Sequence, residues 1–152
     1  KITLGYAMTG SFCTLDKSLR EMARLSSLGC EILPITSENA YTVSTRFGKA
    51  REIVTKVEDI AGKSVIHTVS GAEPIGPHHM CDVLLVAPCT GNTLSKITLG
   101  ITDTPVTSIA EADLVGEPSA EDRHEVDGCQ ENSVELARRC GGEAELRLQE
   151  QE

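Results

Sequence analysis

The chain has 152 residues, which fits one domain with a substantial core. No run of about 18 apolar residues occurs and the start lacks a signal-peptide pattern, so neither a membrane span nor secretion is expected. Residues 1–110 carry ten acidic and ten basic side chains, and residues 111–152 carry 13 acidic and four basic, so the net charge of −9 lies in that last part. Without a basic stripe, the chain is not expected to bind nucleic acid.

Alternating strands and helices are predicted over the first hundred residues. Apolar runs predict four strands, at residues 2–8, 30–36, 64–69 and 82–87. Helical spacing of apolar residues, with Leu15, Leu19 and Met22 as one example, predicts three helices, at residues 15–28, 45–61 and 92–100. Polar turns are expected at residues 37–44 and a loop at residues 71–80. This order predicts a three-layer α/β fold, Rossmann-like or flavodoxin-like, with a parallel sheet between helices.

The character of the sequence changes after Ala110. Residues 111–152 contain few β-branched side chains and no apolar strand run, and only residues 134–139 and 144–148 hint at helix. We therefore expect an α/β domain over residues 1–110. Residues 111–152 are expected to form an acidic tail, either disordered or helical.

Two strand ends carry polar turns that suit a nucleotide or flavin. The first turn is Thr9-Gly10-Ser11, and the second runs from Pro88 to Thr93 after the strand at residues 82–87. Hydroxyls, N–H groups and a helix start at the carboxyl edge of a parallel sheet favour binding of a phosphate. The alternative for the first turn is a simple capped turn. The candidate ligand residues of the second turn are Pro88, Thr90, Asn92 and Thr93, with Asn92 also expected to cap the following helix.

Other candidate side chains lie in the loops between these motifs. Ser37 and Thr42 follow the second strand, where the alternative is a solvated loop. Arg46 and Lys49 offer cations for a carboxylate, with surface charge around a buried Phe47 as the alternative. Lys96 is expected on a solvated helix face.

Cysteines and histidines give weaker signals. The six cysteines form no CxxC pair and are expected to be free thiols in a reducing cytosol, although Cys13 and Cys89 lie in the two ligand turns. His67, His78 and His79 suggest a base or a metal pair, but no third ligand has suitable spacing, so no metal site is predicted.

The motifs resemble those of the flavoprotein family that includes phosphopantothenoylcysteine decarboxylases and flavin prenyltransferases. Thr9-Gly10-Ser11 matches one family motif, and the segment from Ala87 through Lys96 and Gly100 to Asp103 matches a second at about ten positions. Further segments resemble the branch of the family that forms dipicolinate, pyridine-2,6-dicarboxylate. They are residues 8–14, 45–49, 72–77 and 87–106.

The resemblance implies a function for the chain. Members of this branch act as the B component beside a dehydrogenase-like A component of dipicolinate synthase, which would bring NADP, and would form dipicolinate from a dihydrodipicolinate-type precursor. The implied cofactor is FMN, contacted by Thr9, Gly10, Ser11, Ser37, Pro88, Thr90, Asn92 and Thr93. Arg46, Lys49 and Asn92 would bind the dicarboxylate. A homo-oligomer in the cytoplasm of a spore-forming mother cell is implied as well.

Two alternatives remain open at this point. One is a non-catalytic interaction protein that keeps the fold but has lost the cofactor. The other is a flavin-dependent decarboxylase or a prenyltransferase. The decarboxylases carry a histidine eight residues before the aspartate that corresponds to Asp82, and Pro74 stands there in this chain.

Overall fold

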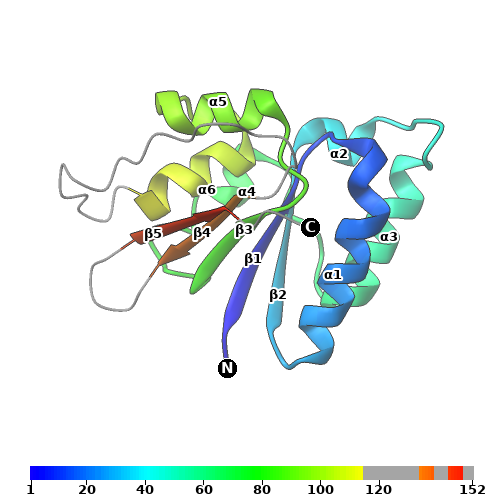
Figure 1. Cartoon of the computed structure of the whole chain (residues 1–152), viewed down its shortest axis with the longest axis horizontal. Coiled ribbons are helices and arrows are strands. Elements are labelled where there is room, and N and C mark those ends of the chain that lie inside the picture. Colours follow the sequence, from blue (N-terminus) through cyan, green and yellow to red (C-terminus); the bar gives the residue numbers. More distant parts are fainter. Residues whose placement is uncertain (115–133, 139–143, 149–152) are drawn as a thin grey trace.

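The computed structural model describes residues 1–114, 134–138 and 144–148 as an α/β fold (Figure 1). One sheet contains strands in the order β2-β1-β3-β4-β5. Their bounds are β1 (Thr3–Met8), β2 (Glu31–Thr36), β3 (Val83–Val86), β4 (Val134–Arg138) and β5 (Ala144–Leu148). The first three strands are parallel, and β4 and β5 extend the sheet antiparallel beyond β3. The predicted Rossmann-like α/β class is confirmed.

Helices cover both faces of the parallel strands (Figure 1). They are the short 3₁₀ helix η1 (Phe12–Thr14), α1 (Leu15–Ser27), α2 (Glu38–Thr42), α3 (Ala50–Ala61), α4 (Val69–Ala72), α5 (Gly91–Leu99) and α6 (Pro105–Leu114). Helices α1 and α3 pack on one face, and α4, α5 and α6 lie on the other. In the part of the chain described here, no helix is both long and apolar enough to cross a bilayer.

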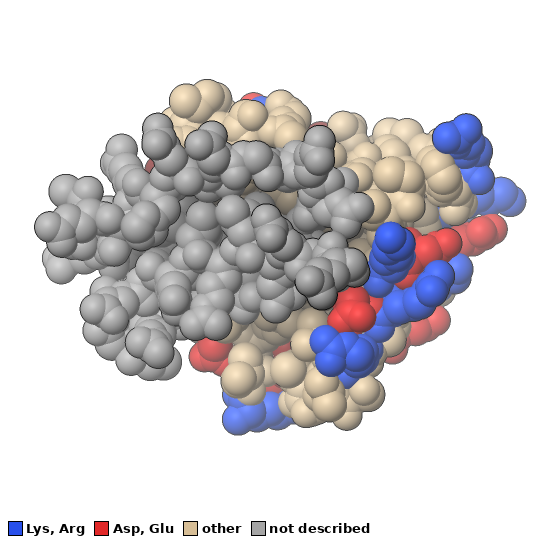
Figure 2. Space-filling model, viewed as in Figure 1, with Lys and Arg blue, Asp and Glu red and all other residues tan. Residues whose placement is uncertain are grey.

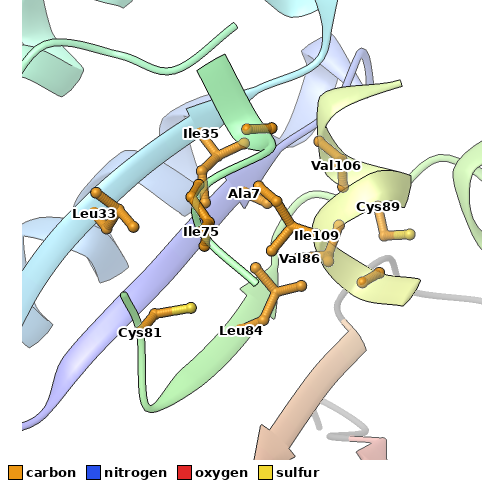
Figure 3. Close-up of a cluster of buried hydrophobic side chains, with 12 residues drawn as sticks. Ala7, Leu33, Ile35, Ile75, Cys81, Leu84, Val86, Cys89, Val106 and Ile109 are labelled. Carbon is orange, nitrogen blue, oxygen red and sulfur yellow. The ribbon is translucent and has the colours of Figure 1, made fainter. Parts of the chain in front are cut away.

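Alternation along β1 divides the core into two clusters. Tyr6 and Met8 point to the α1–α3 face, and Ala7 points to the opposite face. Figure 3 shows the cluster on the face to which Ala7 points, where Leu84 and Val86 of β3 meet residues from α6. Burying one such aliphatic side chain contributes about 1.5–3 kcal/mol, so both faces must be covered for the sheet to be stable.

The outer surface of α1 is charged. Acidic and basic side chains alternate along it, among them Asp16, Lys17, Arg20 and Glu21. Figure 2 shows the two signs interspersed on that side of the molecule. An amphipathic helix of this kind buries its apolar stripe, here Leu15, Leu19 and Met22, and solvates the rest.

The predicted strand at residues 64–69 is wrong. Of this segment, only Ile66 forms a parallel bridge, with Ile35 of β2. Thr68 then starts α4, because its hydroxyl oxygen accepts a hydrogen bond from the N–H of Gly71 at 3.0 Å. The apolar run could therefore not continue as a strand beyond one pairing.

The segment between β2 and α3 also differs from its prediction. The expected turn at residues 37–44 contains α2, and the helix expected from residue 45 begins at Ala50. Thr45 and Gly48 exchange two backbone hydrogen bonds of 3.0 and 3.1 Å, which closes a tight turn and delays the helix. Phe47 lies in that turn and is 47% exposed, so its predicted place in the core is wrong.

The predictions for the end of the chain are corrected in part. The two segments expected to be helical contain β4 and β5; AELRL alternates apolar and polar residues with the period of a strand, and VELAR does so over residues 134–136. The expected boundary at residue 110 falls inside α6, whose Val106, Ile109 and Ala110 are buried. Residues 115–133, 139–143 and 149–152 of the predicted tail lie outside the described residues.

Candidate functional site

The candidate site lies where the chain reverses direction across the sheet. From β1 the chain passes through α1 to β2 on one side, and it later returns to β3 on the other side of β1. The loop after β1 leads to α1 on one face, and the loop after β3 leads to α5 on the opposite face. Ligands of open α/β sheets bind at such a switch point, outside the carboxyl ends of the strands.

Thr9 joins the two loops. Its N–H and its hydroxyl both donate to the carbonyl oxygen of Pro88, at 3.0 and 2.7 Å, and the hydroxyl oxygen accepts from the N–H of Thr90 at 2.8 Å. Thr9 is only 1% exposed. The two motifs singled out in the sequence are therefore fixed side by side, and Thr9 itself holds the loops together.

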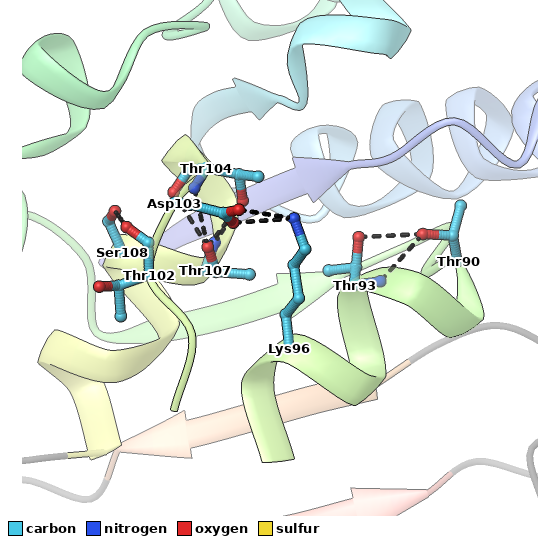
Figure 4. Close-up of polar contacts among 8 residues, drawn as sticks. All are labelled: Thr90, Thr93, Lys96, Thr102, Asp103, Thr104, Thr107 and Ser108. Atoms are coloured by element: carbon cyan, nitrogen blue, oxygen red, sulfur yellow. Dashed lines mark hydrogen bonds and ion pairs between the residues drawn. The ribbon is translucent and has the colours of Figure 1, made fainter. Parts of the chain in front are cut away.

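Thr90 begins α5. Its hydroxyl accepts a hydrogen bond from the N–H of Thr93 at 3.2 Å and donates to the hydroxyl of Thr93 at 2.9 Å (Figure 4). The prediction that Asn92 caps this helix is wrong, because Asn92 lies inside its first turn and is exposed. A Cβ placed on Gly91 would meet no atom within 4 Å, so the backbone at the helix start is open to close approach.

Buried hydrogen bonds from β1 and α1 support the chain at the end of β3. The hydroxyl of Ser18 on α1 donates to the carbonyl of Ala87 at 2.5 Å, and the Tyr6 hydroxyl lies 2.9 Å from the Ser18 hydroxyl. The peptide bond between Ala87 and Pro88 is cis. Burial raises the pKa of Tyr6, against the lowering effect of the Ser18 hydrogen bond, and the charge of Glu21 raises it further.

The loops after β1 and β2 meet at the same edge. The N–H of Ser37 donates to the carbonyl of Met8 at 2.9 Å, and the Ser37 hydroxyl caps α2 by accepting from Ala40. A Cβ on Gly10 would lie 3.7 Å from the Cβ of Asn39 in α2. Thr14 donates to the carbonyl oxygen of Ser11 at 3.0 Å, which shapes the first loop. Of the predicted site residues, those in the loops after β1, β2 and β3 thus share one edge.

The two predicted cations lie in the turn between α2 and α3. The guanidinium carbon of Arg46 lies 4.8 Å from the centre of the Phe47 ring, and the Lys49 ammonium is 3.9 Å from Glu52. Both contacts are on the surface of that turn. Thr42, also predicted at this edge, uses its hydroxyl to donate to the carbonyl of Glu38 at 2.8 Å.

Lys96 is not simply a solvated side chain, as the sequence suggested. It projects from α5 and binds both carboxylate oxygens of Asp103, at 2.8 and 2.9 Å (Figure 4). Thr104 and Thr107 cap α6 reciprocally, each N–H donating to the other's hydroxyl at 3.1 Å. The family motif already contained this lysine and this aspartate, seven residues apart, and that spacing was the signal for the pair.

The histidines and cysteines fall in separate places. His67 stacks on Tyr41 of α2, with ring centres 3.6 Å apart and an interplanar angle of 8°. His78 and His79 are exposed in the turn after α4. Cys13 is exposed beside the first loop, whereas Cys89 is 1% exposed.

The donor set of these loops fits an anion such as the phosphate of a flavin nucleotide. Residues 9–14 and 88–93 contain no acidic side chain and supply threonine and serine hydroxyls, backbone N–H groups and the start of α5. The dipole of a helix start favours a negative charge, and a glycine without neighbours leaves room for it. Gly10, Ser11, Gly91 and Asn92 are the residues of this chain that would hold such a group, and Thr9 and Thr90 would position the two loops around it.

Fold and site together define an α/β protein of the Rossmann-like class with a ligand edge at its switch point. The model of the family described as "Flavoprotein" matches residues 1–117, and the chain belongs to this family.

The chain is similar to several known proteins. It is 37% identical to the B subunit of dipicolinate synthase from Bacillus subtilis (strain 168) over 111 residues, 73% of this chain and 56% of that protein. It is 33% identical over 110 residues to the coenzyme A biosynthesis bifunctional protein CoaBC of Thermococcus kodakarensis, covering 68% of this chain and 25% of that protein. The crystal structure of the dipicolinate synthase B subunit from Bacillus halodurans C is similar with a TM-score of 0.65 and 36% identity, over 77% of this chain and 60% of that one. The chain thus spans less than two thirds of each relative's length.

Proposed function

We propose that the chain acts as the B subunit of a dipicolinate synthase, an oxidoreductase component that binds FMN and works with a dehydrogenase-like A subunit. The single observation that supports this most is the bonding of Thr9 to Pro88 and Thr90, because it unites both flavoprotein motifs at one edge, in two loops without acidic side chains. The similarity to the B subunits of two dipicolinate synthases supports the particular reaction.

The reaction would convert a dihydrodipicolinate-type precursor to pyridine-2,6-dicarboxylate. The precursor would lose a hydride equivalent and a proton, and the chemistry to take up the hydride would come from a flavin held at this edge or from the NADP of the dehydrogenase-like partner. A flavin, when bound, would supply two-electron redox chemistry. The chain's own part would be to hold the phosphate at Gly10, Ser11 and the start of α5, with Thr9 fixing the two loops, and to orient the dicarboxylate through Asn92, Arg46 and Lys49.

An assay with the separately purified dehydrogenase-like partner tests the proposal. The purified chain is expected to raise dipicolinate formation by that partner, and FMN is expected to raise the melting temperature of the chain. A ligand at about 100 times its Kd adds about 2.7 kcal/mol of stability, which is easily seen in a melting scan. Asn92→Ala and Thr90→Ala should lower both effects.

The same assay can also give a result that argues against flavin chemistry. Activity with the partner that survives both substitutions, together with no FMN shift at several concentrations, would favour the non-catalytic interaction protein. The decarboxylase alternative is not supported, because Pro74 stands where the decarboxylases carry a histidine. Pro74 lies in the exposed turn after α4.

A further inference from the structure

Thr36 presents an unusual hydroxyl at the candidate edge. It is the last residue of β2 and is 3% exposed, yet its Oγ1 has no hydrogen-bond partner among the described residues. Nearly all buried polar side chains in proteins are paired, and an unpaired one costs stability. A hydroxyl retained at such a cost suggests a partner other than the residues that the structure describes.

Two aromatic side chains accompany this hydroxyl. The N–H of Thr36 donates to the carbonyl of Ile66 at 2.9 Å, and Ile35 bridges Ile66 in parallel, so His67, the residue after Ile66, follows beside the end of β2. Ile66 packs with the cluster of the α4–α6 face, which directs its neighbour His67 to the α1–α3 face. There His67 stacks on Tyr41, one turn after the cap of α2.

The three side chains offer a consistent chemistry. The hydroxyls of Thr36 and Tyr41 and a ring N–H of His67 are hydrogen-bond donors; the Thr36 hydroxyl has no partner within the described parts of the chain, and Tyr41 and His67 contact each other through their rings. The rings of Tyr41 and His67 are nearly parallel, a geometry that suits a flat ligand. Glu38 of α2 lies two residues after Thr36, and Arg46 and Lys49 follow in the turn after α2, so positive charges outnumber negative ones between Thr36 and Lys49.

We propose that Thr36, Tyr41 and His67 form a subsite for the carboxylate and ring of a flat aromatic acid, beside the edge that binds phosphate. The ligand class rests on the proposed function, since the substrate and product there are cyclic dicarboxylates. The carboxylate accepts hydrogen bonds from Thr36 and His67, and the ring lies against Tyr41. The stacked pair is the arrangement of the subsite without its ligand.

Titration with pyridine-2,6-dicarboxylate, followed by proton NMR of the histidine rings, tests the subsite. The C2–H resonance of His67 is expected to move on binding, and that of His78 is expected to stay. Hydrogen bonds to a charged group are worth enough that Thr36→Val and His67→Gln should each weaken binding about tenfold or more. His78→Gln, the same substitution at an exposed position, should bind as the unaltered chain does. Succinate, which has no ring, should bind more weakly.

Stability separates a ligand role of Thr36 from a structural one. Valine has nearly the shape of threonine and removes only the unpaired hydroxyl, so Thr36→Val is expected to keep or raise the melting temperature while it weakens the dicarboxylate. A lowered melting temperature with unchanged binding would overturn the proposal. Unchanged binding in Thr36→Val, or an unmoved His67 resonance, would overturn it as well.

Parallel FMN titrations keep this proposal distinct from the proposed function. FMN binding without dicarboxylate binding would refute the subsite and leave the flavoprotein function intact. Dicarboxylate binding that depends on Thr36, without FMN binding, would refute the flavin role and support the subsite. Failure of both ligands would overturn both.

Discussion

The hydroxyl oxygen of Thr9 accepts a hydrogen bond from the N–H of Thr90 at 2.8 Å, across 81 positions of sequence. The same hydroxyl donates to the carbonyl of Pro88. One side chain at the end of β1 therefore sets the position of the loop that begins α5. The relative placement of the two flavoprotein motifs depends on this contact.

Replacing Thr9 tests that dependence. Thr9→Val keeps the volume of the side chain but leaves the buried carbonyl of Pro88 and the N–H of Thr90 without that partner, which should cost about 1–3 kcal/mol in the free energy of unfolding. Urea unfolding measures the loss. Thr55→Val on the exposed surface of α3 is the matched control and should change stability by less than about 0.5 kcal/mol. Equal effects of the two substitutions would contradict the role given to Thr9.

The start of α5 allows stability and binding to be separated. Thr90→Ala removes the helix cap and should cost about 0.5–2 kcal/mol. Asn92 is exposed and caps nothing, so Asn92→Ala should change stability by less than about 0.5 kcal/mol and still weaken FMN. Thermal unfolding and flavin fluorescence, measured on the same samples, check both. A large loss of stability in Asn92→Ala would show that the cap is assigned to the wrong residue.

The raised pKa of Tyr6 predicts that the stability of the fold depends on pH in the alkaline range. Its pKa is raised in the folded state by burial, so the unfolded chain loses this proton first as the pH rises. The contribution of Tyr6 is complete below the unfolded pKa of about 10 and declines as the pH rises from there through the folded pKa. Urea unfolding of the unaltered chain and of Tyr6→Phe between about pH 8 and 11 isolates this effect, because lysines titrate in both. The difference in stability between the two should shrink with rising pH, and a constant difference would contradict the burial effect.

Lys96 and Asp103 link α5 to the start of α6. The side chain of Asp103 is 58% exposed and that of Lys96 22%, so the pair should contribute no more than about 1 kcal/mol. A double-mutant cycle with Lys96→Met and Asp103→Asn measures the coupling, which should fall at high salt. Coupling well above that value, or coupling that salt does not reduce, would mean that the pair is effectively buried.

The sequence predicted the elements with strong periodicity and failed where turn chemistry decided. Helix α1 and strands β1 and β2 came from apolar spacing, and the switch-point edge followed from their order. The segment around Ile66 read as a strand, but the cap at Thr68 ended it. The turn at Thr45–Gly48 delayed α3 and exposed Phe47, because two backbone hydrogen bonds outweighed the helical spacing.

Some features of the candidate site were also predictable from the sequence and others were not. Both loop motifs were found from their residue types, since hydroxyls and glycine at strand ends carry the signal. The role of Thr9 as the link was not predictable, because it depends on the neighbouring placement of β1 and β3. The unpaired hydroxyl of Thr36 and the stack of Tyr41 on His67 arise from tertiary contacts and have no local pattern.

The central claim is that the loops after β1 and β3 hold the phosphate of a flavin nucleotide. Titration of the chain with FMN and with riboflavin, followed by flavin fluorescence, tests it most directly because the two ligands differ only in that phosphate. Saturable FMN binding at least about tenfold tighter than riboflavin, reduced in Thr9→Val, is the predicted result, since a hydrogen-bonded anion is worth more than about 1.4 kcal/mol. Equal affinity for both ligands, or no binding of either, would contradict the claim.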